Sequence, residues 1–188
     1  TLFIHLTLVP CIGAAGELKT KPTQHSVKEL RAIGIQPDIL LCRTDRILSK
    51  ELKAKIALFC SVSNEAVITA KDVSSIYEVP LVLRAEGIDK IILKQLELST
   101  KESNMTQWQE LVDKISHPTD SVDIGIVGKY VEFGESYKSL NEALIHAGLF
   151  HNLKAKVHWI EAEGVEGENW TDQLSKFDGI LVPGGFGK

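Results

Sequence analysis

The densest group of chemically useful side chains is the run Lys19-Thr20-Lys21-Pro22-Thr23-Gln24. It places two ammonium groups, two hydroxyls and an amide between a predicted strand and the predicted start of a helix. Lysines neutralise a phosphate, and hydroxyls and the free N–H groups of a helix N-terminus donate hydrogen bonds to it. The run is therefore typical of a phosphate-binding turn. The alternative is a solvated loop in which Pro22 and Thr23 simply begin the helix, and composition alone favours that alternative.

Two other positions could meet a nucleotide. Lys55 lies on a predicted helix, and Lys71-Asp72-Val73 follows directly after a predicted strand, where a base edge or a phosphate can approach. Lysines and aspartates at single positions are usually surface charges, and Asp72 could instead cap the short segment 73–78. The residue types alone leave both interpretations open.

Two glycine-containing turns follow predicted strands in the second half. Gly128-Lys129-Tyr130 is similar to the end of a P-loop, but the first glycine of that motif would fall at Asp123 and its hydroxyl residue at Tyr130, so the motif fails. The turn at 184–187 is Gly-Gly-Phe-Gly, whose missing Cβ atoms let backbone N–H groups approach a developing oxyanion. By itself it could also be only a tight turn. No cysteine follows Cys60, so a thiolate nucleophile for acyl transfer in this half would not lie on this chain.

The elements that must position these residues follow a repeated pattern. Continuous apolar runs separated by helical segments indicate parallel strands covered by helices on both faces. The pattern occurs twice and predicts an α/β fold with two partial doubly wound, mostly parallel-sheet domains joined by a linker. The predicted strands are 2–9, 38–42, 66–69, 122–127, 155–160 and 179–183, and the predicted helices are 24–33, 50–60, 81–86 and 136–149. Ligands in such sheets bind beyond the carboxyl ends of the strands, where the turns described above lie.

The segment between about 95 and 121 is mostly polar and lacks periodicity, which is typical of linkers. It contains one amphipathic helix, capped by Thr106, with an apolar stripe at Trp108, Leu111, Val112 and Ile115. We therefore expect one domain over 1–98, a linker with one helix over 99–121, and a second domain over 122–188. Because the chain starts at the edge of a strand and ends after a glycine-rich turn, we expect it to be part of a longer protein.

The composition narrows the class of ligand. The chain has 188 residues, of which 44% are hydrophobic and 24% charged, as in a soluble globular protein with one or two modest cores. The formal net charge of -4 provides no general positive field, so we expect small-molecule ligands and no nucleic acid. The apolar run 2–9 stops at Pro10 and is too short to span a membrane. Cys11, Cys42 and Cys60 are scattered and odd in number, which fits a reducing cytosol without a disulfide framework.

Taken together, these segments resemble the CTP synthase family. The most specific block is the Lys-Thr-Lys-Pro-Thr-Gln-His run from Lys19, and other blocks follow in the family's order and approximate spacing. The matching blocks are 6–10, 16–30, 34–38, 53–60, 71–77, 126–130 and 181–187. The resemblance covers essentially the whole chain and is weakest across 97–121 and 152–176.

The resemblance implies a reaction and a role for each candidate residue. The parent enzyme would use ATP to phosphorylate the uracil O4 of UTP, and ammonia released from glutamine would then displace that phosphate to give CTP. The residues implied to contact UTP as substrate and CTP as feedback inhibitor are Lys19, Thr20, Lys21, Pro22, Thr23, Gln24 and Lys55. ATP would be bound by Lys71, Asp72 and Val73. Gly185 would support bound glutamine and its oxyanion, and Lys129 would lie near the contact between the two domains.

The resemblance also implies what lies outside the chain. It makes 1–98 the C-terminal part of the synthetase (amidoligase) domain and 122–188 the N-terminal part of a class I glutamine amidotransferase domain. The family's P-loop and acidic Mg²⁺ ligands would precede Thr1, and the glutaminase cysteine, histidine and glutamate would follow Lys188. We therefore expect no catalytic residue and no metal ligand on this chain, and we expect the chain alone to be inactive.

The family further implies ATP and Mg²⁺ as cofactors, GTP as an allosteric activator, a homotetrameric parent and a cytoplasmic location without membrane association. Two other interpretations compete with a piece of the enzyme. One is a truncated relative that binds nucleotides or subunits without catalysis. The other is a generic doubly wound nucleotide binder, which would have no link to pyrimidine nucleotides.

Overall fold

The computed structural model describes residues 1–13, 16–99, 104–129, 137–165 and 170–184. The chain forms two compact units, Thr1–Met105 and Thr106–Lys188. Each unit is an α/β structure with a parallel sheet, which confirms the predicted fold class. The finer domain limits given above stay a prediction.

The sheet of the first unit contains three parallel strands in the order β1-β4-β5. Their bounds are Ile4–Leu8, Ile39–Thr44 and Val67–Lys71. Leu8 pairs with Arg43, and Thr44 pairs with Lys71, so the three carboxyl ends meet at one edge of the sheet. That edge is where a doubly wound sheet binds its ligands.

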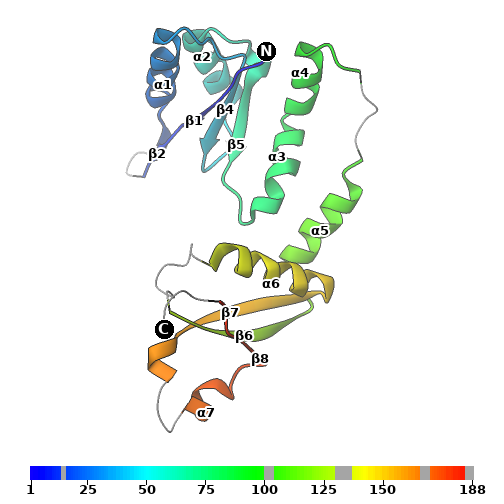
Figure 1. Ribbon diagram of the computed structural model, residues 1–188. Coiled ribbons are helices and arrows are strands. Elements are labelled where there is room, and N and C mark those ends of the chain that lie inside the picture. The colour runs from blue at the N-terminus through cyan, green and yellow to red at the C-terminus, as the bar shows by residue number, and fades with distance from the viewer. Residues whose placement is uncertain (14–15, 100–103, 130–136, 166–169, 185–188) are drawn as a thin grey trace. The chain divides into compact units, whose positions relative to one another are not determined.

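Helices cover both faces of this sheet (Figure 1). On one face lie α1 (Lys21–Ala32) and α2 (Lys50–Cys60), and on the other α3 (Val79–Ala85) and α4 (Ile88–Gln95). The α1 and α2 side contains a buried cluster that includes Val27, Leu40 and Ile56. The opposite side contains Ile39 and Ile68, packed against side chains of α3 and α4. Burial of apolar side chains on both faces is the main stabilising force of such a layered unit.

The structure differs from the prediction at three places in this unit. First, α1 starts three residues early, because Pro22 is tolerated in a first turn whose N–H groups have no intrahelical partner. Second, α4 follows α3 almost at once, because Gly87 has a φ of 81°, a left-handed conformation that ends α3 and lets a new helix begin at Ile88. Third, the strands β2 (Cys11–Ile12) and β3 (Glu17–Leu18) form an antiparallel hairpin whose strands are too short to show a period in the sequence.

The second unit contains a parallel sheet in the order β7-β6-β8, with β6 central. The strands are β6 (Asp120–Gly128), β7 (Leu153–Glu161) and β8 (Gly179–Leu181), and the helices are α5 (Thr106–Ser116), α6 (Lys138–Phe150) and α7 (Trp170–Leu174). Helix α6 lies over one face of the sheet and α7 on the other side (Figure 1). In α5 the predicted apolar stripe is centred on Val112, which is buried, and the helix begins at Thr106 itself, the residue predicted to cap it. Short 3₁₀ turns complete the described elements: η1 (Asn64–Ala66), η2 (Ile76–Glu78) and η4 (Ala162–Val165).

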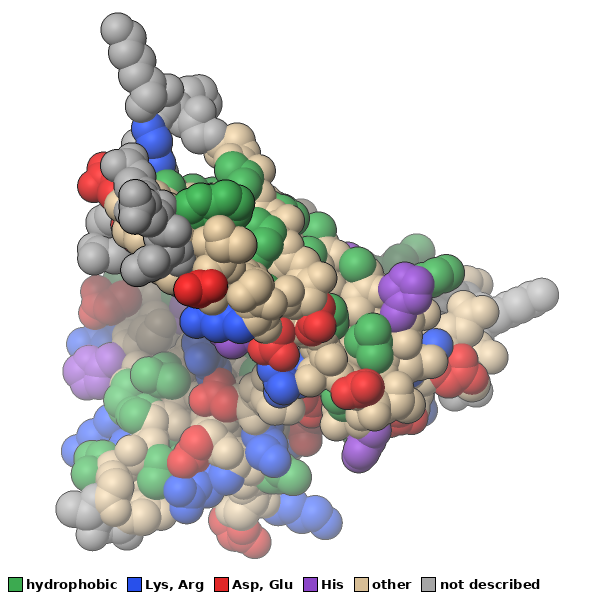
Figure 2. All heavy atoms as spheres, turned by 90° about the horizontal axis from the view of Figure 1, so that it is seen from below, with side chains coloured by type: hydrophobic (Ala, Val, Ile, Leu, Met, Phe, Trp, Pro, Cys, Tyr) green, Lys and Arg blue, Asp and Glu red, His purple; other side chains and the backbone are tan. Residues whose placement is uncertain are grey.

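Figure 2 shows one face of the molecule, on which acidic, basic and hydrophobic side chains are intermixed. Neither sign of charge dominates that face. Among the described residues, the exposed large hydrophobic side chains include Ile33, Leu58, Phe150 and Val182. None of the described helices has both the length and the apolar character needed to cross a membrane.

All three cysteines are free thiols. Cys42 and Cys60 are buried in the cluster beneath α1 and α2, and Cys11 is half-buried beside it. Burial raises the pKa of Cys42 to about 12, and burial also raises the pKa of Cys60. These two thiols therefore serve as small apolar core groups.

A carboxylate is bound to the outer edge of β5. Glu86 Oε2 accepts hydrogen bonds from Thr69 N at 2.7 Å and from Lys53 Nζ at 2.5 Å. Burial alone would raise the pKa of Glu86, but these hydrogen bonds outweigh burial and hold it below its ordinary value. The contact joins the end of α3 to α2 around an edge strand and satisfies an N–H group that would otherwise be available to another chain.

Replacing Glu86 with glutamine should lower the free energy of unfolding by about 1–2 kcal/mol at pH 7, because a charge-assisted hydrogen bond to Lys53 is lost. A lowered carboxyl pKa stabilises the folded chain above the unfolded-state pKa, and this stabilisation is lost as the pH falls through the folded-state pKa. Urea unfolding of the full chain, monitored by circular dichroism, should thus show that E86Q has a lower free energy of unfolding than the unmodified chain at pH 7. This difference should shrink below about pH 4.

The matched control is Glu65→Gln. Glu65 forms a more exposed pair with Lys94 at 3.7 Å, which should contribute about 0–1 kcal/mol. An E86Q effect that is as large at pH 3 as at pH 7 would show that Glu86 acts through packing and not through its charge.

Candidate functional site

The start of α1 is bound to the carboxyl end of β1 by a buried hydroxyl pair. Thr7 Oγ1 donates to Thr23 Oγ1 at 3.0 Å, and Thr23 Oγ1 donates to the carbonyl oxygen of Leu8 at 3.0 Å. Thr23 is fully buried. The Thr23 hydroxyl, predicted to contact a nucleotide, therefore forms its hydrogen bonds inside the protein. These bonds position the segment 19–24.

A side-chain hydrogen bond between Thr20 and Gln24 stabilises the first turn of α1. Thr20 is buried at the N-cap position, and its Oγ1 accepts a hydrogen bond from Gln24 Nε2 at 3.2 Å. Its side chain does not cap the helix, and the first turn contains no acidic residue. Lys21 and Pro22 are exposed on the same turn. The helix N-terminus thus presents N–H groups and a cation to solvent, an arrangement that favours an anion.

Lys19 pairs with a carboxylate on which the charge of Lys55 acts more weakly. Lys19 Nζ lies 2.5 Å from Glu17 Oε2, and Glu17 is on strand β3 of the hairpin. The hydrogen bond and charge of Lys19, with a smaller contribution from the charge of Lys55 on α2, hold the pKa of Glu17 below its ordinary value. The charge of Lys55 on α2 thus reaches the carboxylate that pairs with Lys19. Sequence reasoning did not single out Glu17, although its place two residues before Lys19 was a usable signal.

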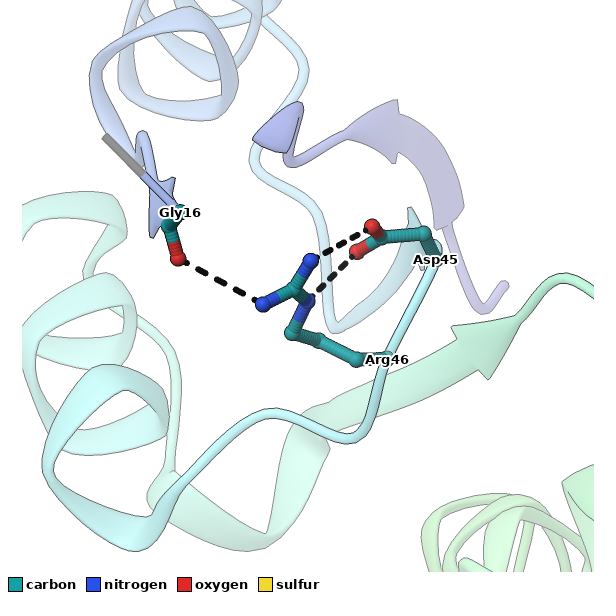
Figure 3. A network of polar contacts seen from close by, with 3 residues as sticks. All are labelled: Gly16, Asp45 and Arg46. Carbon is teal, nitrogen blue, oxygen red and sulfur yellow. Dashed lines mark hydrogen bonds and ion pairs between the residues drawn. The ribbon is translucent and has the colours of Figure 1, made fainter. Parts of the chain in front are cut away.

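Arg46 fixes the hairpin at this edge (Figure 3). Its guanidinium donates to both carboxylate oxygens of Asp45, at 3.0 and 2.9 Å, and to the carbonyl oxygen of Gly16 at 3.4 Å. The hydrogen bond from Arg46 lowers the pKa of Asp45. Because Asp45 and Arg46 directly follow β4, these contacts join the hairpin to the carboxyl end of the sheet.

The predicted ATP residues lie at the end of β5. Lys71 is its last residue, and Asp72 N donates to Thr44 O at 2.8 Å. The alternative that Asp72 caps 73–78 is wrong: Ser75 caps η2 in a capping box with Glu78. The Asp72 carboxylate instead accepts a hydrogen bond from Arg43 Nε at 2.8 Å, an exposed pair.

Two open depressions meet at Arg43. One, of about 500 Å³, is lined by Lys71, Asp72 and Val73 together with apolar side chains of β1, β4 and α3. The other, of about 430 Å³, is lined by Leu6, Thr7, Leu8, Pro22, Ser26 and Arg43. Leu6 and Arg43 line both, so the start of α1 and the end of β5 border one continuous surface. Arg43 was missed by sequence reasoning, although an arginine near the carboxyl end of an apolar strand was a signal for it.

In the second unit Lys129 is exposed directly after β6. Its predicted role at a contact between domains stays a prediction, and Gly185 lies outside the described residues. Among the residues that the structure describes, no group of three or more histidine, cysteine, aspartate or glutamate side chains could hold a metal ion.

Comparisons with known proteins confirm the family of the resemblance, but they do not show the expected division into the end of a synthetase domain and the start of a glutaminase domain. Residues 1–98 match the family model described as CTP synthase N-terminus. Similar curated proteins include the CTP synthases of Koribacter versatilis (67% identical), Acidobacterium capsulatum (65%) and Methanocaldococcus jannaschii (53%). The first two matches cover 100% of this chain and 34% of the relative, and the third covers 99% and 36%. The chain thus spans about a third of the length of the curated relatives it matches.

Replacing Thr23 with valine should lower the free energy of unfolding by about 1–3 kcal/mol, because valine keeps the shape but leaves the Leu8 carbonyl and the Thr7 hydroxyl without a buried partner. Thr23→Ser, which keeps the hydroxyl, is the matched control and should cost less. Urea unfolding measures both. A T23V chain as stable as the unmodified one would show that the hydroxyl pair does not anchor α1.

Proposed function

This chain belongs to the CTP synthase family, and from that premise we propose that it is part of an enzyme that makes CTP from UTP, ATP and glutamine. The observation that carries the proposal is the carboxyl edge of the first sheet. There the start of α1 and the Lys71-Asp72-Val73 segment border one surface, and Lys19 lies directly before the N-cap of α1.

We propose that the pyrimidine nucleotide binds at the start of α1. Lys19, Lys21 and Lys55 neutralise its phosphates, and the uncapped N–H groups of the first turn donate to them. That turn is held in place by the side-chain hydrogen bonds of Thr20, Thr23 and Gln24. Pro22 lines the depression beside it. CTP acts at the same residues as a feedback inhibitor.

ATP binds along Lys71, Asp72 and Val73, with Arg43 beside them. ATP supplies the phosphoryl group, and Mg²⁺ would neutralise its phosphates when bound. Among the described residues, no group of three or more histidine, cysteine, aspartate or glutamate side chains could hold this metal. GTP as an activator, a homotetramer and a cytoplasmic location belong to the same proposal and rest on the family alone.

The proposed domain limits place 1–98 at the end of the synthetase domain, 99–121 in a linker and 122–188 at the beginning of a glutamine amidotransferase domain. The family model that matches is that of the CTP synthase N-terminus, and its match ends at residue 98. The second compact unit, with its own parallel sheet, supports a separate domain after that point. In that domain we propose that Gly185 supports the glutamine oxyanion and that Lys129 lies near the first domain.

A chimera tests the nucleotide site. In it, this chain replaces the matching segment of the Koribacter versatilis CTP synthase. Lys19→Ala and Lys21→Ala should each raise the KM for UTP by roughly 10- to 100-fold, because each removes a charge-assisted contact to phosphate. Glutamine hydrolysis should stay largely intact.

The matched control is Lys28→Ala, an exposed lysine two turns further along α1. An unchanged KM for UTP in both K19A and K21A would refute the site. Binding of UTP by a chimera that forms no CTP would instead favour a nucleotide-binding relative without catalysis.

Gly185→Ala tests the second unit in the same chimera. A Cβ atom beside an oxyanion interferes with close approach of a backbone N–H, so glutamine-dependent CTP formation should fall by roughly 10- to 1000-fold. Ammonia-dependent formation should be retained, since free ammonia bypasses the glutaminase. An equal fall of both reactions in folded protein would make Gly185 a structural turn residue, and no fall in either would place the turn outside the glutamine site.

A further inference from the structure

A carboxylate of the protein itself pairs with Lys19, one of the lysines proposed to bind nucleotide phosphates. Glu17 Oε2 accepts a hydrogen bond from Lys19 Nζ at 2.5 Å. The charge of Lys55, a second lysine of the proposed site, acts on the same carboxylate more weakly. Glu17 therefore interacts with two cations that the proposed function assigns to the nucleotide.

The extended backbone of the hairpin explains why these two side chains meet. Lys19 N donates to Pro10 O at 2.9 Å, which continues the ladder by one residue beyond the pair formed by Cys11 and Leu18. Successive side chains of an extended strand point to opposite sides, so Glu17 and Lys19 share one side. Leu18, between them, belongs to the buried cluster beneath α1 and α2. The burial of this leucine therefore leaves the carboxylate and the ammonium group together at the surface.

The backbone beside Glu17 is fixed, whereas its side chain can change partner. Arg46 donates to the carbonyl oxygen of Gly16, the residue before Glu17, and to both carboxylate oxygens of Asp45 (Figure 3). The side chain of Glu17 is 65% exposed and that of Lys19 is 39% exposed. Exposed ion pairs are weak, and opening this one requires no rearrangement of the core. A phosphate can therefore take the place of the carboxylate at Lys19.

We propose that Glu17 is an intramolecular competitor of the nucleotide phosphates, and that its carboxylate must give way at Lys19 when UTP or CTP binds. The inference rests on the proposed function, in which Lys19 binds a phosphate of both nucleotides. A carboxylate that has to leave its cation, and that stays tethered beside the incoming phosphate, weakens binding of that phosphate. Because the competition concerns the phosphate contact and not the base, Glu17 lowers the affinity for substrate and inhibitor by the same factor.

The test uses the chimera described above. Glu17→Gln keeps the size of the side chain and removes its charge. It should lower both the KM for UTP and the CTP concentration that gives half-maximal inhibition by roughly 2- to 5-fold, the range that a weak exposed ion pair supports. The value of kcat should stay the same, because the competition acts on binding and not on the chemical step. A gain in affinity is a result that a purely structural role of Glu17 would not produce.

Two further variants separate competition at Lys19 from a general effect of charge. In the Lys19→Ala background the carboxylate has no cation to compete for, so the KM for UTP of the double variant E17Q/K19A should stay close to that of K19A. The matched control is Glu29→Gln, an exposed glutamate further along α1. It removes the same charge and should leave both the KM and the inhibition by CTP unchanged.

Four results would overturn the inference: an unchanged or raised KM for UTP in E17Q, a gain for only one of the two nucleotides, an equal gain in the K19A background, or an equal gain in E29Q. If K19A itself leaves the KM for UTP unchanged, the proposed nucleotide site fails and this inference fails with it. A raised KM in K19A together with an unchanged KM in E17Q overturns the inference alone. The two failures are therefore distinguishable in one set of measurements.

Discussion

The buried hydrogen bonds of Thr23 are the constraint on which the first unit's candidate site depends. They hold α1 to the end of β1, and the predicted nucleotide contacts at the start of α1 depend on the resulting orientation. Thr20, Thr23 and Val27 lie at helical spacing and are all buried, so the same helix turns Lys21 and Pro22 outwards. Because an unpaired buried hydroxyl or carbonyl is costly, this orientation is well defined before any ligand arrives.

Three cations of this edge form ion pairs with carboxylates. Lys19 pairs with Glu17, Arg43 with Asp72, and Arg46 with Asp45. All three are exposed pairs, which contribute little to stability and are readily exchanged. A phosphate can therefore replace a carboxylate as the partner of a lysine at small cost, while the carboxylates keep the edge from becoming a strongly positive surface. This fits a chain whose formal net charge is -4 and whose proposed ligands are anions.

The sequence allowed the strands and the larger helices to be predicted because continuous apolar runs and 3.6-residue stripes reflect burial directly. The hairpin β2–β3 could not be predicted, because strands of two residues show no period in the sequence. Helix α4 could not be predicted either, because Gly87 indicates the end of α3 without indicating that a second helix follows. At the candidate site, residue types drew attention to segments at the carboxyl edge of the sheet but did not show the direction of each side chain. Thr23 faces inward and Asp72 is paired with Arg43, and both facts depend on strand register, which joins residues far apart in sequence. The role of Gly185 at the glutamine oxyanion could be predicted only from the family resemblance, because that role depends on where the ligand binds, which composition does not encode.

The reactivity of the two buried cysteines reports whether the core of the first unit is closed. A thiol with a pKa of about 12 is ionised at pH 7 to a fraction on the order of 10⁻⁵, and only the thiolate reacts with oxidants or alkylating agents. Cys42 lies on the central strand and Cys60 at the end of α2, so neither becomes reactive until the layer of α1 and α2 separates from the sheet. The rate at which Cys42 is modified would therefore measure how often this unit opens to expose its core, whereas the half-buried Cys11 would react on smaller movements near the hairpin.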